Sequence, residues 1–274
     1  MSQPFVEIEG FRCYAPDVAL ACDDYPSDGF DVTVSVEASS FWCRTRNRVL
    51  RGVFDRFVER TRPMDVLEIG CGTGNVLREL RRIPNLRLTG SEVNLQGLRY
   101  ARAGLSDLTF IQLDATNMPF DAAFDVVGAF DVLEHIDADE DVMRGVHRAL
   151  RSGGLFIVTV PQFPWLWSTL DEIVEHKRRY RRKELIDKLD GAGFSVTYVT
   201  SFVTALFPLM AASRLLGRGR SKPHGTAAAF AAEVSLPGPL NWVFDKVMRV
   251  DEAALRMGAT LPFGGSLLAV AQRR

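Results

Sequence analysis

The sequence has few cysteines and no closely spaced cysteine pair. Its 274 residues include only Cys13, Cys22, Cys43 and Cys71, which lie far apart along the chain. Cysteine-based zinc sites usually need a C-x-x-C pair, and a disulfide framework needs a denser set of cysteines. The pattern therefore argues against both and favours a reducing compartment.

The sequence also lacks an excess of one charge and a long apolar run. Its formal net charge is −1, so the whole molecule has no general attraction for nucleic acid. The longest apolar stretch, residues 202–216, is short for a bilayer span and contains Pro208 and Arg214. The first ten residues include acidic side chains and lack the apolar centre of a secretory signal. We expect a cytoplasmic protein.

From residue 64 onward, strand-like and helix-like segments alternate. Apolar runs typical of buried strands occupy residues 64–69, 86–92, 108–113, 124–130, 154–160 and 194–200, and a last one follows at 266–272. Helix-like periodicity separates most of the first six runs. This alternation predicts right-handed βαβ crossovers and an α/β fold with a mainly parallel sheet covered on both faces.

Two further segments flank or interrupt this pattern. Residues 1–38 suggest a loop-rich extension, and residues 40–60 predict a helix with an apolar face and arginines opposite it. Residues 202–264 are apolar, with a glycine-rich loop at 217–225. We therefore divide the chain into an N-terminal extension and helix (1–60), an α/β core (61–201), a helical insertion (202–264) and a final core strand (265–274). The first and third parts are expected to form a cap over the site.

The strongest motif is "VLEIGCGTGN", residues 66–75, at the junction of a strand and a helix. Glycines allow the backbone to turn tightly and to approach a ligand, and the helix that follows offers free N–H groups. The dinucleotide fingerprint G-x-G-x-x-G requires a glycine where Asn75 stands, so that fingerprint fails. Cys71, inside the motif, is interpreted as a small residue chosen for fit.

Polar residues follow the next three strands. Glu92 ends the second strand, Asp114 ends the third, and Asp131, Glu134 and His135 follow the fourth. Ligands of open α/β sheets bind at the carboxyl ends of the strands. A pocket so rich in carboxylates suits a cationic ligand better than a pyrophosphate.

In their order and position these four motifs resemble the class I S-adenosylmethionine-dependent methyltransferases, over roughly residues 60–200 and the last strand. The resemblance implies a doubly wound, mainly parallel, seven-stranded Rossmann-like sheet. Its last strand would be antiparallel and inserted between the fifth and sixth. S-adenosylmethionine would be the cofactor, which makes residues 61–201 the cofactor-binding core.

The resemblance also implies which residues bind the cofactor. The glycines would pack against its methionine part with Glu68 nearby, and Glu92 would bind the ribose diol. Asp114 and Ala115 would meet the adenine, while Phe130 and Asp131 would line the methionine part and face the substrate. The full set is Glu68, Gly70, Cys71, Gly72, Gly74, Glu92, Asp114, Ala115, Phe130 and Asp131.

The segment after the fifth strand, residues 163–185, must emerge at the same sheet edge as the glycine motif. Trp165 and Trp167 would form an apolar wall for the substrate. If the loop turns back, Asp171 would orient His176 to remove a proton from a hydroxyl acceptor. Two weaker candidates for this role are Tyr180 and His135. The alternative is that His176 and Arg179 only pin the loop through hydrogen bonds.

Six lysines and arginines lie between residues 177 and 183. Three interpretations stay open: a solvated helix start, contact with a substrate anion through Arg179, or contact with RNA. Binding of nucleic acid is not expected, because the total charge is near zero. No Asp, Glu, His and Cys set shows metal-ligand spacing, so no metal is expected, although scattered carboxylates that recruit one stay open.

These observations predict an S-adenosylmethionine-dependent methyltransferase that acts on a small organic acceptor with an apolar body. O-methylation by direct in-line transfer is expected. The alternatives are an RNA or protein methyltransferase that uses the basic run, and a non-catalytic cofactor-binding module. Peripheral membrane contact through the apolar cap and homo-oligomerisation stay open.

Overall fold

The computed structural model describes residues 4–21, 29–216 and 236–274. Its centre is a nine-stranded sheet in the order β1-β2-β5-β4-β3-β6-β7-β9-β8. The strands are β1 (Val6–Ile8), β2 (Phe11–Cys13), β3 (Met64–Ile69), β4 (Leu86–Glu92), β5 (Thr109–Gln112), β6 (Phe124–Phe130), β7 (Leu150–Pro161), β8 (Phe194–Phe202) and β9 (Ser266–Arg273).

The sheet is parallel from β2 to β7. The last strand, β9, lies between β7 and β8 and is antiparallel to both. The β3, β4, β5 and β6 strands pair in parallel, so their carboxyl ends meet at one edge. The predicted α/β class and mainly parallel sheet are confirmed.

The predicted number of seven strands is wrong, because the N-terminal segment adds two. β2 pairs in parallel with β5, and β1 pairs with β2 in antiparallel fashion. Phe11 and Cys13 point into the core while Arg12 between them is exposed, which is the alternation of a half-buried strand. Three residues are too few for this alternation to be distinguished from a loop by sequence.

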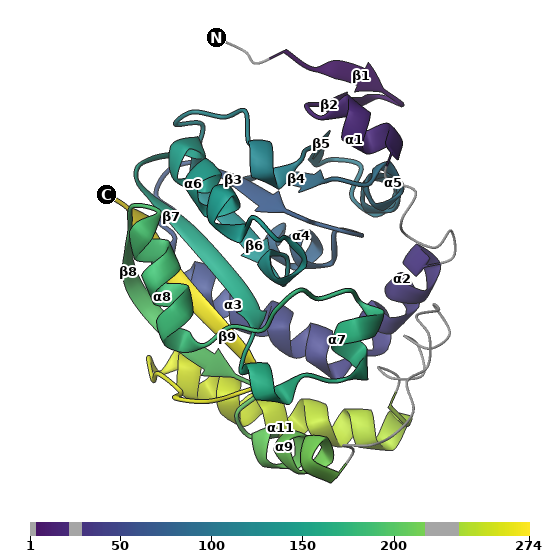
Figure 1. Cartoon of the computed structure of the whole chain (residues 1–274), viewed down its shortest axis with the longest axis vertical. Helices are drawn as coiled ribbons and strands as arrows, with labels where there is room; N and C mark the ends of the chain where they lie inside the picture. The colour runs from purple at the N-terminus through teal and green to yellow at the C-terminus, as the bar shows by residue number, and fades with distance from the viewer. Residues whose placement is uncertain (1–3, 22–28, 217–235) are drawn as a thin grey trace.

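Helices cover both faces of the sheet (Figure 1). The described helices are α1 (Pro16–Ala21), α2 (Gly29–Ser39), α3 (Phe41–Phe57), α4 (Asn75–Leu80), α5 (Leu95–Gly104), α6 (Asp139–Ala149), α7 (Thr169–Ile173), α8 (Arg182–Gly191), α9 (Phe207–Leu216) and α11 (Gly238–Arg256). Short 3-10 turns η1 (Ala115–Asn117), η2 (Leu133–His135) and η3 (Pro164–Leu166) follow β5, β6 and β7.

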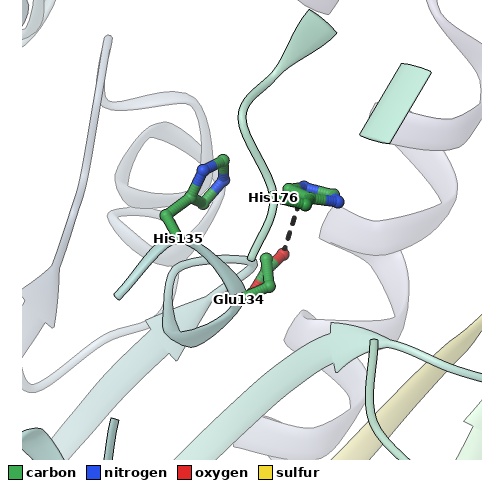
Figure 2. Close-up of side chains that lie close together, drawn as sticks. All are labelled: Glu134, His135 and His176. Atoms are coloured by element: carbon green, nitrogen blue, oxygen red, sulfur yellow. Dashed lines mark ion pairs between the residues drawn. The ribbon is translucent and has the colours of Figure 1, made fainter. Parts of the chain in front are cut away.

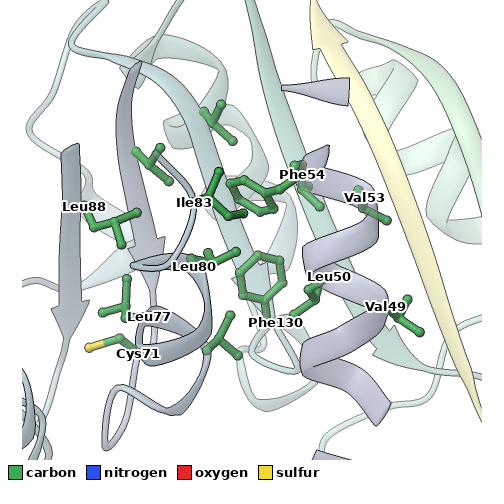
Figure 3. Close-up of a cluster of buried hydrophobic side chains, with 14 of the residues drawn as sticks. Val49, Leu50, Val53, Phe54, Cys71, Leu77, Leu80, Ile83, Leu88 and Phe130 are labelled. Atoms are coloured by element: carbon green, nitrogen blue, oxygen red, sulfur yellow. The ribbon is translucent and has the colours of Figure 1, made fainter. Parts of the chain in front are cut away.

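Two apolar clusters hold the layers together. On one face, the predicted stripe of α3, with Leu50 and Phe54 fully buried, packs with Leu77 and Leu80 of α4 and with Phe130 (Figure 3). On the other face, the buried sides of α6 and α8 pack against β6, β7 and β9. Burial of the core faces is the main favourable term in folding.

The arginines of α3, predicted to lie opposite its apolar face, do not all face solvent. Arg48 pairs with Asp245 at 2.9 Å and with Glu252 at 2.6 Å, and Arg44 pairs with Asp245 at 3.2 Å. All these acids lie on α11, so the N-terminal helix and the insertion are bound to one another. The two segments were expected to form a cap together. The glycine-rich loop predicted at residues 217–225 lies outside the described residues.

We expect replacement of Arg48 with methionine to lower the free energy of unfolding by about 2–3 kcal/mol, because two largely buried carboxylates lose their shortest ion pair and keep only the more exposed Arg44 and Arg249. Denaturant unfolding of both proteins measures the loss. Arg82→Met is the matched control: Arg82 follows the end of α4, is mostly exposed and pairs with Glu79 of that helix. That control should change stability by less than about 0.5 kcal/mol.

Within the described ranges, no helix is both long enough and apolar enough to cross a membrane.

Candidate functional site

The glycine motif forms a loop between β3 and α4 at the carboxyl edge of the sheet. Gly70, Gly72 and Gly74 all have φ between 50° and 78°, where residues with a side chain are strained. A Cβ on Gly70 would lie 2.6 Å from Val132, whereas a Cβ on Gly72 would meet nothing within 4 Å. The loop is therefore packed from behind at Gly70 and open at Gly72, where a ligand can approach the backbone.

Glu92 links the end of β4 to this loop. One carboxylate oxygen accepts a hydrogen bond from the Gly72 N–H at 3.0 Å, and the other accepts from Val93 at 2.8 Å. Burial raises the pKa of Glu92, and the backbone N–H donors partly oppose that rise. The carboxylate is thus held rigidly beside the open side of the loop.

Glu68 is buried without a matching donor. Its side chain is 3% exposed, and its Oε2 atom has no hydrogen-bond partner among the described residues. Burial raises the pKa of Glu68 to about 8, while Arg46 acts in the opposite direction. A buried acceptor without a donor is costly unless a ligand supplies one. The ammonium group of a bound S-adenosylmethionine is such a donor, so this residue fits the expected cofactor.

Asp131 follows β6 in a left-handed conformation with φ of 59°. Its Oδ2 atom accepts a hydrogen bond from Nη1 of Arg46 at 3.1 Å. Arg46 comes from α3, is mostly buried, and lies over the Trp42 ring. This role could not be predicted from the sequence, because the arginines of this helix are predicted to lie opposite its apolar face. Only the packing of α3 against the strand ends turns it toward the site.

The helix α2 also reaches the glycine loop. Glu37 accepts a hydrogen bond from the Thr73 hydroxyl, and burial raises the pKa of Glu37. Asn47 of α3 donates to the Asn75 side chain at 2.6 Å. These contacts place the N-terminal helices over the cofactor loop, and neither Glu37 nor Asn47 was predicted.

The remaining predicted cofactor residues lie at the expected strand ends. Asp114 caps η1 and accepts from both the N–H and the hydroxyl of Thr116. Ala115 and Cys71 are buried, and burial raises the pKa of the Cys71 thiol, which agrees with a residue chosen for fit. The Phe130 ring lies inside the core cluster (Figure 3).

The loop after β7 turns back so that Asp171 meets His176. Nδ1 of His176 lies 2.8 Å from Oδ1 of Asp171. Arg179 also holds Asp171, with Nε at 2.7 Å and Nη2 at 2.9 Å, and Ser168 donates through its N–H and its hydroxyl. The hydrogen bonds from His176 and Arg179 keep the pKa of Asp171 well below its usual range against the cost of burial. The Arg179 guanidinium therefore binds Asp171, and it also holds the loop by donating to the Gln162 carbonyl.

His176 lies beside Glu134 and His135, which come from η2 (Figure 2). Nε2 of His176 is 3.8 Å from Oε1 of Glu134, and the two imidazole rings are 4.7 Å apart. Burial and the nearby Asp131 raise the pKa of Glu134. Desolvation by the surrounding protein lowers the pKa of His135 to about 4, and His176 and Lys177 add to that shift, although the residue as a whole is exposed. The sequence did not predict this cluster, because its two parts are forty residues apart.

Tyr180, the other predicted base of this segment, does not belong to the cluster of Glu134, His135 and His176. Its side chain is fully buried, and its hydroxyl donates to Asp139 at 2.7 Å. Burial and this bond raise the pKa of Tyr180 far above its ordinary value. The interpretation of Tyr180 as a base has no support in this geometry, because the hydroxyl lies in the core beside α6.

Two further features of this segment were predicted: an apolar wall of Trp165 and Trp167, and the basic run at residues 177–183. Trp165 and Trp167 remain 43% and 38% exposed, and Trp165 contacts Phe207 at the start of α9. In the basic run, Arg178 pairs with Asp139 and Lys183 with Asp187, while Arg182 donates to main-chain oxygens of residues 199 and 261. These internal partners favour a structural role for that part of the run.

The sheet order, the glycine loop and the acids at the strand ends define an α/β protein with a Rossmann-like fold and a nucleoside-cofactor site. Comparison with known proteins agrees. A family model described as a methyltransferase domain matches residues 67–158. A probable S-adenosylmethionine-dependent methyltransferase of Mycolicibacterium smegmatis is 31% identical over 187 residues, which are 66% of this chain and 69% of that protein. The chain therefore belongs to the S-adenosylmethionine-dependent methyltransferases, whose cofactor is S-adenosylmethionine.

Other known proteins are similar over a smaller part of their length or at lower sequence identity. A sterol 24-C-methyltransferase of Gibberella zeae is 33% identical over 129 residues, which are 44% of this chain and only 33% of that protein. The structure of phosphoethanolamine N-methyltransferase 2 of Haemonchus contortus, solved with S-adenosyl-L-methionine, has a TM-score of 0.60 at 18% identity. It covers 93% of this chain and 59% of that one. This structural similarity concerns the fold.

Proposed function

We propose that the protein transfers a methyl group from S-adenosylmethionine to an oxygen atom of a small organic acceptor with an apolar body. S-adenosylmethionine supplies an electrophilic methyl carbon on a positively charged sulfur. The observation that carries this proposal is the position of His176: Asp171 orients it, and it stands beside Glu134, three residues beyond Asp131 of the cofactor site. An oriented imidazole at this place suits an acceptor that loses a proton.

The residues around the glycine loop would hold the cofactor. In this proposal Glu92 accepts hydrogen bonds from the ribose hydroxyls, Glu68 faces the ammonium group, and Asp114 and Ala115 lie along the adenine. Asp131 and Arg46 would border the methionine part. Such fixed groups align the methyl carbon with the acceptor, and alignment is the main contribution a protein makes to a direct displacement.

Two observations support an apolar acceptor. Phe163, Trp165 and Phe207 form an aromatic group where the loop after β7 meets α9. The relatives include proteins named for a sterol and for demethylmenaquinone. Since the sterol enzyme is named for transfer to carbon, carbon is the second candidate for the acceptor atom. The cap of α3, α9 and α11 would shield the acceptor side.

The proposal is tested by incubating the purified protein with methyl-labelled S-adenosylmethionine and separate panels of phenols, hydroxylated lipids, sterols, RNA and protein. Label on the oxygen of a phenol or hydroxylated lipid is expected. Label on carbon would move the reaction to the second candidate. Label only on RNA or protein would contradict the small-molecule acceptor, and cofactor binding without any label would indicate a non-catalytic module.

Cofactor binding at pH 6.5 is expected to release about 0.5–1 proton per chain. The reason is that Glu68, with a pKa of about 8, carries a proton in the free protein, and an adjacent ammonium favours its carboxylate form. Affinity should accordingly rise between pH 6.5 and 8. Calorimetric titration in buffers of different ionisation enthalpy counts the protons. Glu68→Gln should bind without this release, and an unchanged release in that variant would contradict the assignment.

A further inference from the structure

We propose that Glu134, His135 and His176 form a binding site for one divalent transition-metal ion of the zinc type. One potential ligand atom from each of these residues lies within 4.8 Å of the others. Tetrahedral ligands of one ion at about 2.1 Å lie about 3.4 Å apart, so side-chain shifts of about 1 Å would close the site. Nε2 of His176 and Oε1 of Glu134, at 3.8 Å, already lie close to this spacing.

Glu134 is the first reason to expect a cation here. Its side chain is 1% exposed, and neither carboxylate oxygen has a hydrogen-bond partner among the described residues. Buried carboxylates are normally paired, hydrogen-bonded or bound to a metal. Among the described residues, the basic group paired with it is the His176 imidazole, which Figure 2 shows joined to it by the dashed line. A bound cation would satisfy both oxygens at once.

The orientation of His176 is the second reason. Because Arg179 and Ser168 donate to Asp171, its carboxylate acts as an acceptor, and Nδ1 of His176 must donate to it. The lone pair of the neutral ring then lies on Nε2, the atom that faces Glu134. A histidine that ligates a metal almost always donates its other N–H to a carboxylate or carbonyl in this way.

The main chain fixes the two parts of the cluster relative to one another. The Lys177 N–H donates to the Glu134 carbonyl at 2.7 Å, which ties the loop of His176 to η2. His135, on η2, is exposed, so an ion has a route to the site. Two nitrogen ligands and one carboxylate are typical of transition-metal sites rather than of magnesium sites, and three protein ligands leave a fourth position open.

A catalytic role of this ion rests on the proposed function, whereas the binding of the ion does not. With an acceptor hydroxyl at the open position, the ion would lower the pKa of that hydroxyl. The proton would pass to solvent water, the oxygen would form its bond to the methyl carbon, and the broken carbon–sulfur bond would leave its electron pair on sulfur. His176 would then activate the acceptor as a metal ligand.

The test uses the full-length protein after removal of metal by chelation, without cofactor or acceptor. Titration with Zn²⁺ is followed by calorimetry. A second titration with Co²⁺ is followed by visible absorption. We expect one ion per chain and a tenfold or larger loss of affinity, roughly, in Glu134→Gln, His135→Ala and His176→Ala. Asp171→Asn should weaken binding about tenfold through the position of His176. His147→Ala, which removes a histidine of α6 outside the cluster, should bind as the unchanged protein does.

Absence of stoichiometric binding would overturn the proposal, as would equal affinity in all the variants. Should the variants unfold, X-ray absorption of the unchanged Co²⁺-loaded protein still decides: two imidazole nitrogens and a carboxylate oxygen are expected, and any other ligand set contradicts the site. Metal binding at the cluster without methyl transfer would leave the site standing and overturn the proposed function. Methyl transfer that persists after full chelation would separate the ion from catalysis.

Discussion

Replacing His176 with alanine is expected to lower the turnover number by about 100- to 10,000-fold and to leave cofactor affinity within about twofold of its original value. Among the described residues, His176 interacts with Asp171, Glu134 and His135, none of which belongs to the glycine loop. Asp171 keeps Arg179 and Ser168 as partners after the substitution, so the loop should stay folded. Steady-state kinetics together with cofactor titration measures both quantities.

Two other substitutions provide the comparison for this prediction. His147 lies on α6 and contacts Phe194, so His147→Ala should leave turnover unchanged. Asp171→Asn should reduce turnover less than His176→Ala, because the imidazole remains but is no longer oriented by a charge. If turnover in His176→Ala equals that of the original protein, His176 serves only to pin the loop.

Glu92→Ala is expected to weaken cofactor binding by about 100-fold, which corresponds to about 3 kcal/mol. Hydrogen bonds to a charged group contribute roughly 1.5–3 kcal/mol each, and the proposed ribose contact uses two hydroxyls. The substitution also removes the acceptor for the Gly72 N–H, which loosens the loop. Calorimetric titration of S-adenosylmethionine gives the dissociation constant, and thermal unfolding confirms that the protein titrated is folded.

Two substitutions separate loss of the carboxylate from loss of structure. Glu92→Gln keeps the size of the side chain and an acceptor oxygen for Gly72, so its affinity should fall between those of Glu92→Ala and the original protein. Glu9→Ala removes an exposed glutamate that pairs with Arg99, and it should bind the cofactor normally. Normal binding by Glu92→Ala would remove the ribose contact from the proposed function.

Much of the α/β core could be predicted because its signals are local. A buried parallel strand is a short continuous apolar run, and the glycine loop at residues 70–74 must follow such a strand. The carboxyl ends of parallel strands share one edge, so the positions of Glu92, Asp114 and Asp131 followed from their place in the chain. β1 and β2 were missed because three residues carry too little periodicity.

Predictions about the candidate site failed where a contact joins distant segments. Arg46 belongs to a polar helix face by pattern, yet it pairs with Asp131, which is 85 residues further along the chain. Tyr180 has the chemistry of a base, but packing against α6 buries its hydroxyl beside Asp139. The contact between Asp171 and His176 was expected on the condition that the loop turns back, and the structure has that turn.

The sequence by itself determined the class of fold, the strand ends and the cofactor motifs, because each depends on the order and spacing of neighbouring residues. Only the tertiary structure decided that Glu134, His135 and His176 meet, and that helices α2 and α3 lie over the glycine loop. The physical reason is that a side chain's neighbours across the core depend on how layers pack. Packing brings residues together by shape and burial, whatever their separation along the chain.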